Sequence, residues 1–74
     1  MIKIKNDVDV LLLKELGFKH YEETNECPEK YEWRNEDKNK FEYVTIYVWN
    51  GKISAENVND KVFELFQMGL VEKV

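Results

Sequence analysis

The chain has 74 residues, of which 43% are hydrophobic and 35% charged, and its formal net charge is -4. A chain of this length can build one hydrophobic core and no second one, so we expect a single domain over residues 1–74. The acidic total disfavours general binding to nucleic acid, because that binding depends on a basic face.

The cysteine count and the apolar runs indicate a compartment. Cys27 is the only cysteine, so no intramolecular disulfide can form, and we expect a reducing cytoplasm. The opening residues alternate Ile with Lys and lack the continuous apolar segment of a signal peptide. The longest apolar run is Val10 to Leu13, far below the roughly 20 residues that cross a bilayer. No membrane association is expected.

A first helix is predicted near the N-terminus. Asn6 and Asp7 are residue types that cap helix starts. Apolar residues follow at helical spacing, namely Val8, Leu11, Leu12 and Leu16. The helix should end at about Leu16, because Gly17 can adopt the left-handed conformation and Phe18 can pack back on the last turn.

Three segments have the character of strands. Residues Phe18 to Glu22 predict a short strand, and Lys30 to Arg34 alternates so that Tyr31 and Trp33 share one face. Phe41 to Trp49 is dense in aromatic and β-branched residues and predicts the central strand. The polar residues before it favour a hairpin between the last two segments.

The central strand has two different faces. One is aliphatic, with Val44, Ile46 and Val48. The other carries Phe41, Tyr43, Thr45, Tyr47 and Trp49. Asn50-Gly51 is the preferred dipeptide of a two-residue type I′ turn. That turn predicts four strand pairs: Trp49 with Lys52, Val48 with Ile53, Tyr47 with Ser54, and Ile46 with Ala55.

A second helix should cover the aliphatic face. Asn57 or Asn59 can cap it, and its apolar stripe is Val58, Val62, Leu65 and Phe66. Val58 can also contact Phe63 beside the cap. Gly69 and Leu70 repeat the ending of the first helix before a short tail. The predicted fold is therefore α+β, an antiparallel sheet of three or four strands with an N-terminal and a C-terminal helix.

The aromatic face is the candidate binding site. Its residues are Tyr43, Tyr47 and Trp49 with Lys52, extended by Tyr31 and Trp33 from the neighbouring strand. Large exposed apolar faces mark interaction sites, and Tyr and Trp are enriched in interface hot spots. The alternative is that the first helix packs on this face and makes it part of the core.

Catalytic and metal sites lack the residues they need. His20 is the single histidine and Cys27 the single thiol, so neither a paired nucleophile nor an ordinary metal site can be assembled from them. No glycine-rich phosphate loop is present. We therefore expect no enzyme activity, no metal and no cofactor.

Three functional interpretations remain. The first is a protein-binding module with the aromatic face at its centre and an acidic rim. The second is a single-stranded nucleic-acid-binding protein, in which Tyr43, Tyr47 or Trp49 stacks on bases while phosphates are held by Lys38, Lys40 and Lys52. The acidic total makes nucleic acid the weaker choice. The third is a self-associating structural protein, for example a homodimer.

Three segments carry a resemblance. Ile2 to Asp9, Lys14 to Phe18 and Gly69 to Val74 resemble parts of small uncharacterised proteins encoded by phages and prophages of low-GC Gram-positive bacteria. The resemblance implies an accessory protein that binds a host protein, as anti-CRISPR and other anti-defence inhibitors do. It covers the two ends of the chain and implies no catalytic residues.

Overall fold

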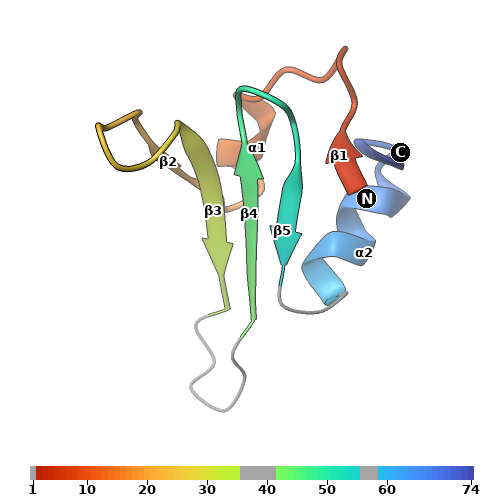
Figure 1. Ribbon diagram of the computed structural model, residues 1–74. Coiled ribbons are helices and arrows are strands. Elements are labelled where there is room, and N and C mark those ends of the chain that lie inside the picture. The colour runs from red at the N-terminus through yellow and green to blue at the C-terminus, as the bar shows by residue number, and fades with distance from the viewer. Residues whose placement is uncertain (1, 36–41, 56–58) are drawn as a thin grey trace.

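The computed structural model describes residues 2–35, 42–55 and 59–74, and these form an α+β fold (Figure 1). In chain order the elements are β1 (Ile2–Ile4), α1 (Leu12–Glu15), β2 (Lys19–Tyr21), β3 (Lys30–Arg34), β4 (Tyr43–Tyr47), β5 (Ile53–Ala55), α2 (Asp60–Gln67) and β6 (Val71–Lys73). No helix in these three ranges combines the length and apolar character required for a membrane crossing.

The main sheet has four antiparallel strands in the order β2-β3-β4-β5, which confirms the predicted antiparallel sheet. β1 and β6 form a second, two-stranded antiparallel sheet that the sequence did not predict. Residue Lys3 bridges to Lys52, and the Ile4 N–H donates to the Gly51 carbonyl at 2.8 Å. The chain ends therefore pair with each other and dock beside β5.

The first helix is shorter than predicted. It begins at Leu12, not after Asn6 or Asp7. The Asp9 carboxylate accepts from the Leu11 N–H at 2.9 Å, and the Leu12 N–H donates to the Asp9 carbonyl at 3.0 Å, so the turn that leads into the helix starts at Asp9 and not at Asn6 or Asp7. Its closure is as predicted, because the Phe18 N–H donates to the Leu13 carbonyl at 3.0 Å.

The second helix starts at the predicted cap. The Asn59 side chain accepts from the Val62 N–H at 3.1 Å and donates to the Tyr43 carbonyl at 3.2 Å, so it ties α2 to β4. Val62 and Leu65 are buried, whereas Phe63 is exposed. The predicted roles of Val58 and Asn57 fall outside the described residues.

The β4–β5 hairpin has a longer turn than predicted. Ile46 pairs with Ile53 and not with Ala55. A type I′ turn needs positive φ at both central residues, and among residues 48–51 only Gly51 has it, at 71°. Four residues therefore form the loop, and the Gly51 N–H donates to the Tyr47 carbonyl at 2.8 Å. A shift of two residues keeps every side chain on its predicted face.

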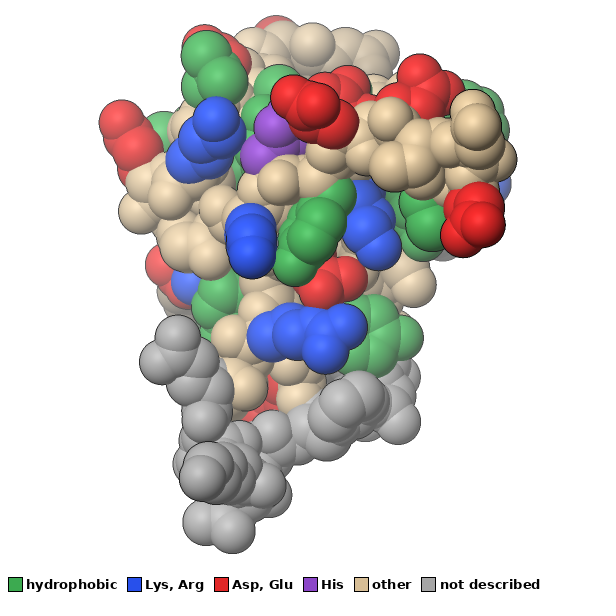
Figure 2. Space-filling model, turned by 90° about the vertical axis from the view of Figure 1, so that its left-hand side faces the viewer, with side chains coloured by type: hydrophobic (Ala, Val, Ile, Leu, Met, Phe, Trp, Pro, Cys, Tyr) green, Lys and Arg blue, Asp and Glu red, His purple; other side chains and the backbone are tan. Residues whose placement is uncertain are grey.

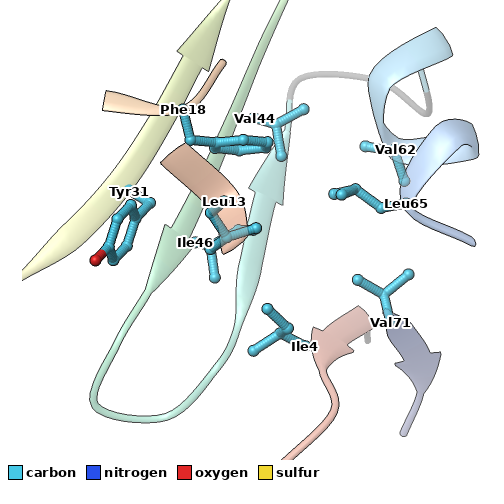
Figure 3. Packing of buried hydrophobic residues seen from close by; sticks show 9 residues of the cluster. All are labelled: Ile4, Leu13, Phe18, Tyr31, Val44, Ile46, Val62, Leu65 and Val71. Carbon is cyan, nitrogen blue, oxygen red and sulfur yellow. The ribbon is translucent and has the colours of Figure 1, made fainter. Parts of the chain in front are cut away.

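The core lies on one side of the four-stranded sheet, which we call the inner face (Figure 3). Its buried residues are Ile4, Leu13, Phe18, Tyr31, Val44, Ile46, Val62, Leu65 and Val71. They come from both helices, both sheets and the segment after α1. Because Leu13 of α1 packs with Val44 and Ile46, the alternative in which the first helix covers the aromatic face is wrong.

Candidate binding surface on the outer face of the sheet

The opposite side of the sheet, the outer face, carries charged residues, tyrosines and hydroxyls. Strand alternation and the observed register place ten residues there: Lys19, Tyr21, Lys30, Glu32, Arg34, Tyr43, Thr45, Tyr47, Lys52 and Ser54. Both helices pack on the inner face, and no described element lies over these ten residues.

One row of this face alternates tyrosine with lysine across all four strands. Tyr21 lies opposite Lys30, Lys30 lies opposite Tyr47, and the Tyr47 N–H donates to the carbonyl of Lys52 at 3.0 Å. Neighbouring strands are about 4.8 Å apart. Like groups therefore recur about every 10 Å along the row.

The outer face is positively charged although the chain is acidic. Its cations are Lys19, Lys30, Arg34 and Lys52, and its single acid is Glu32. Seen from the β2 side, Lys and Arg side chains surround hydrophobic ones in the middle of the molecule, and most acidic side chains lie toward the upper edge (Figure 2). The net charge of -4 thus conceals a local surface of opposite sign.

Glu32 is held ionised by its neighbours. Its carboxylate accepts from Arg34 Nε at 2.7 Å and from the Thr45 hydroxyl at 3.4 Å, and it lies 3.7 Å from Lys30 Nζ. Burial alone would raise the pKa of Glu32, but the Arg34 hydrogen bond and the charges of Arg34 and Lys30 outweigh burial and lower it. The same hydrogen bond raises the pKa of Arg34.

Two cations are held against Tyr21. The ammonium groups of Lys19 and Lys30 each lie 5.5 Å from the centre of the Tyr21 ring. This is the geometry of a cation–π contact, which orders a flexible lysine without neutralising its charge. Lys19 keeps its full charge for an anionic partner, whereas Lys30 shares its charge with Glu32.

The six predicted site residues do not form one surface. Tyr43, Tyr47 and Lys52 belong to the outer face, as predicted. Trp49 is not on the strand, because β4 ends at Tyr47, and it stands in the loop with 73% of its surface exposed. Lys38, Lys40 and Phe41 fall outside the described residues.

Tyr31 and Trp33 are on the inner face, so the predicted extension of the aromatic surface is wrong. Tyr31 pairs with Ile46 and is only 3% exposed. Burial, followed by the charges of Glu29 and Asp9, raises its pKa. Trp33 pairs with Val44 and packs against the core.

The sequence analysis missed five outer-face residues, namely Lys19, Tyr21, Lys30, Glu32 and Arg34. The alternation in β3 was recognised, and it places Lys30, Glu32 and Arg34 opposite to Tyr31. The missing information was which residues of β3 lie opposite which residues of β4, because this decides which side chains of the two strands share a face. Had Tyr31 been matched with Ile46, the cations would have fallen beside Tyr43 and Tyr47.

A hollow of about 590 Å³ adjoins the outer face at the β4–β5 loop. Its lining comprises Pro28, Tyr47, Trp49, Asn50, Lys52, Ile53, Ser54 and Ala55. A second hollow, of about 480 Å³, shares Pro28 and Trp49 with the first and is also lined by Glu23 and Glu29. A third, of about 330 Å³, is lined by Trp49 together with Lys3 and Lys5. The exposed indole therefore borders hollows that carry charges of both signs.

Other reactive side chains occur singly or in pairs. His20 Nε2 lies 2.7 Å from Glu29 Oε2, and the His20 ring stacks on Tyr31 with 4.7 Å between ring centres. Cys27 is a free, exposed thiol. Across residues 2–35, 42–55 and 59–74, no three His, Cys, Asp or Glu side chains converge in a way that could hold a metal ion.

Comparisons of the chain with protein-family models, with curated proteins and with solved structures gave no match.

Proposed function

We propose that this protein is a non-enzymatic binding module that docks an acidic region of another protein on the outer face of its sheet. One observation carries the proposal. Four cations and three tyrosines share a sheet face that no described element covers, in a chain whose net charge is -4. An open face of this composition complements an acidic partner, and tyrosines supply contact area at little entropic cost.

A protein partner is favoured over single-stranded nucleic acid. Stacking along a strand needs several open aromatic rings. Trp49 is open, but within the face the Tyr21 ring has two ammonium groups over it. The ionised Glu32 stands within the face, and the acidic remainder of the chain repels a densely charged strand. A protein segment can place a few carboxylates opposite the cations of the face. It carries no continuous run of negative charge that would meet Glu32 and the other acidic residues of the chain.

Self-association through this face is disfavoured by charge. A two-fold axis would set the outer face of one copy against the same face of the other. Each face carries four cations and one acid, so their approach brings net like charge together, which is unfavourable. A partner of opposite sign has no such penalty.

The resemblance to phage proteins indicates where the partner is found. An accessory phage protein of this kind would act in the bacterial cytoplasm on a host protein, which includes the possibility of an anti-defence inhibitor. The single free thiol of Cys27 suits a reducing compartment.

Charge reversal on the face tests the proposal. The probes are a short glutamate-rich peptide and an oligothymidylate, each labelled for fluorescence anisotropy. The test variant carries Lys19→Glu with Lys30→Glu. The control carries Lys14→Glu with Lys73→Glu, which changes the net charge equally at exposed positions outside the outer face. We expect the peptide to bind the wild type and the control alike, and the test variant about tenfold more weakly.

The outcomes separate the three interpretations. Binding of the oligothymidylate without the peptide would replace the proposal by nucleic-acid binding. A mass that doubles with concentration, with neither probe bound, would favour self-association. Equal losses in both variants would show that net charge alone governs binding and would overturn the assignment of the face. Capture from a nuclease-treated bacterial lysate with the same variants would then identify the natural partner.

A further inference from the structure

Trp49 stands in the β4–β5 loop, two residues beyond Tyr47, and its exposure is unusual for so large an apolar side chain. It is 73% exposed, whereas tryptophan is highly buried on average. Tyr47 and Lys52 belong both to the tyrosine and lysine row and to the hollow beside Trp49. The row and the hollow are therefore continuous.

The loop that carries Trp49 is held in place by its backbone. The Gly51 N–H donates to the Tyr47 carbonyl at 2.8 Å, and the Lys52 N–H donates to the Asn50 side chain at 2.9 Å. The Val48 N–H donates to the Glu29 carbonyl at 3.1 Å, which attaches the loop to the segment before β3. A loop fixed in this way loses little entropy on binding.

The hollow has an apolar lining and one charged residue. Pro28, Tyr47 and Trp49 contribute apolar surface, and Lys52 contributes the charge. Its volume of about 590 Å³ falls within the range of about 300–1,000 Å³ typical of ligand sites. Such a site fits an apolar side chain that lies next to a carboxylate.

The charges around Trp49 suit a partner with few carboxylates near its anchor. Lys52 lines the first hollow, Glu23 and Glu29 line the second, and Lys3 and Lys5 line the third. A carboxylate next to an anchor in the first hollow is therefore attracted toward Lys52 and repelled from the glutamates.

From these observations we infer that the hollow at Trp49 receives an aromatic or large aliphatic side chain of the acidic partner segment. The inference rests on the proposed function and refines it. The partner is then an acidic linear segment in which one apolar anchor adjoins the carboxylates that meet Lys52 and Lys30. Anchors of this kind supply most of the affinity in many interfaces.

Two peptides test the inference. Both are glutamate-rich and identical except at one central position, which is phenylalanine in one and alanine in the other. Against the wild type, we expect the phenylalanine peptide to bind about tenfold more tightly, from burial of its ring. Against Trp49→Ala, this ratio should fall to about one, with the alanine peptide bound as before. Trp49→Phe should preserve most of the ratio.

The controls distinguish this inference from the proposed function. Thermal unfolding should be nearly unchanged in Trp49→Ala, because the side chain is exposed. If both peptides bind the wild type equally and Lys19→Glu with Lys30→Glu weakens both, the hollow is not an anchor site and the outer face still is. A ratio that persists in Trp49→Ala would also overturn the inference. If neither peptide binds, both ideas fail.

Discussion

The two faces of the four-stranded sheet are built from the same strands by alternate residues. In β4, Val44 and Ile46 are fully buried beneath α1 and α2, while Tyr43 and Tyr47 on the other side keep part of their surface exposed. In β3, the inner Tyr31 is buried, and the outer Lys30 and Arg34 meet Glu32.

The difference between the faces separates stability from recognition. The inner face excludes water, so its residues should control the free energy of unfolding. The outer face keeps its charges near solvent, where ion pairs contribute little to stability. Substitutions on the outer face should therefore change binding far more than folding, and the following predictions test this division.

The largest expected loss of stability comes from the inner face. Ile46→Ala should lower the free energy of unfolding by about 2–5 kcal/mol, because Ile46 is fully buried and its removal leaves a cavity. The outer-face control Ser54→Ala should change it by less than about 0.5 kcal/mol. Urea denaturation followed by circular dichroism measures both. Similar losses in the two variants would contradict the division between faces.

A pair of glycines tests how closely the terminal sheet docks against the main sheet. Gly51 and Gly69 have nearly the same φ, 71° and 72°. A Cβ at Gly51 would lie 3.1 Å from Ile4 Cγ2 and 3.3 Å from its carbonyl, whereas a Cβ at Gly69 would meet nothing within 4 Å.

We expect Gly69→Ala to destabilise by about 1 kcal/mol through backbone strain alone. Gly51→Ala should add the displacement of Ile4 and cost about 2 kcal/mol in total. Thermal unfolding of the two variants provides the comparison. If they lose equal stability, the contact between β1 and the β4–β5 loop is looser than the structure describes.

Local features of the fold could be predicted from the sequence because local chemistry determines them. Asn59 caps α2, and the endings at Gly17 and Gly69 make the predicted backbone bonds. The strong β pattern predicted β4 and the faces of Tyr43 to Tyr47 correctly, although the strand ends at Tyr47 and not at Trp49. These features depend on residues within one or two turns of each other.

Features that depend on distant residues could not be predicted. β1 and β6 are three residues each, and each becomes a strand by pairing with the opposite end of the chain. The start of α1 depended on whether the side chain of Asn6, Asp7 or Asp9 would accept a hydrogen bond from the backbone of the first turn. The Asp9 carboxylate accepts it, from the Leu11 N–H.

The candidate site was predicted in part for the same reason. The positions of Tyr43, Tyr47 and Lys52 on the outer face follow from alternation within one hairpin. The predicted register was wrong by two residues, and a shift by an even number of residues leaves each side chain on the same face. Tyr31 and Trp33 were assigned to the wrong face because the pairing of β3 with β4 does not follow from alternation within either strand. The same pairing decides that Lys30 and Arg34 lie on the outer face.

A smaller effect is expected where α2 is attached to the sheet. Asn59→Ala removes both the cap on Val62 and the bond to the Tyr43 carbonyl, and it should cost about 1 kcal/mol. Asn25→Ala, in the exposed loop before β3, is the matched control and should be neutral. Urea denaturation separates them. A neutral Asn59→Ala would show that packing of Val62 and Leu65 alone holds the helix.

An effect of similar size, which links the two faces, concerns Glu32. Because its pKa is lowered in the folded state, its ionisation stabilises the fold above the unfolded value of about 4.3, and that stabilisation is lost as pH falls through the folded value. Glu32→Gln should therefore destabilise by about 1 kcal/mol at neutral pH and by almost nothing at about pH 2. Denaturation at both pH values measures this. A loss independent of pH would mean that the carboxylate acts by shape and not by charge.

At neutral pH the same variant leaves Arg34 and Lys30 without their anion, so it should bind the glutamate-rich peptide more tightly than the wild type although it is less stable.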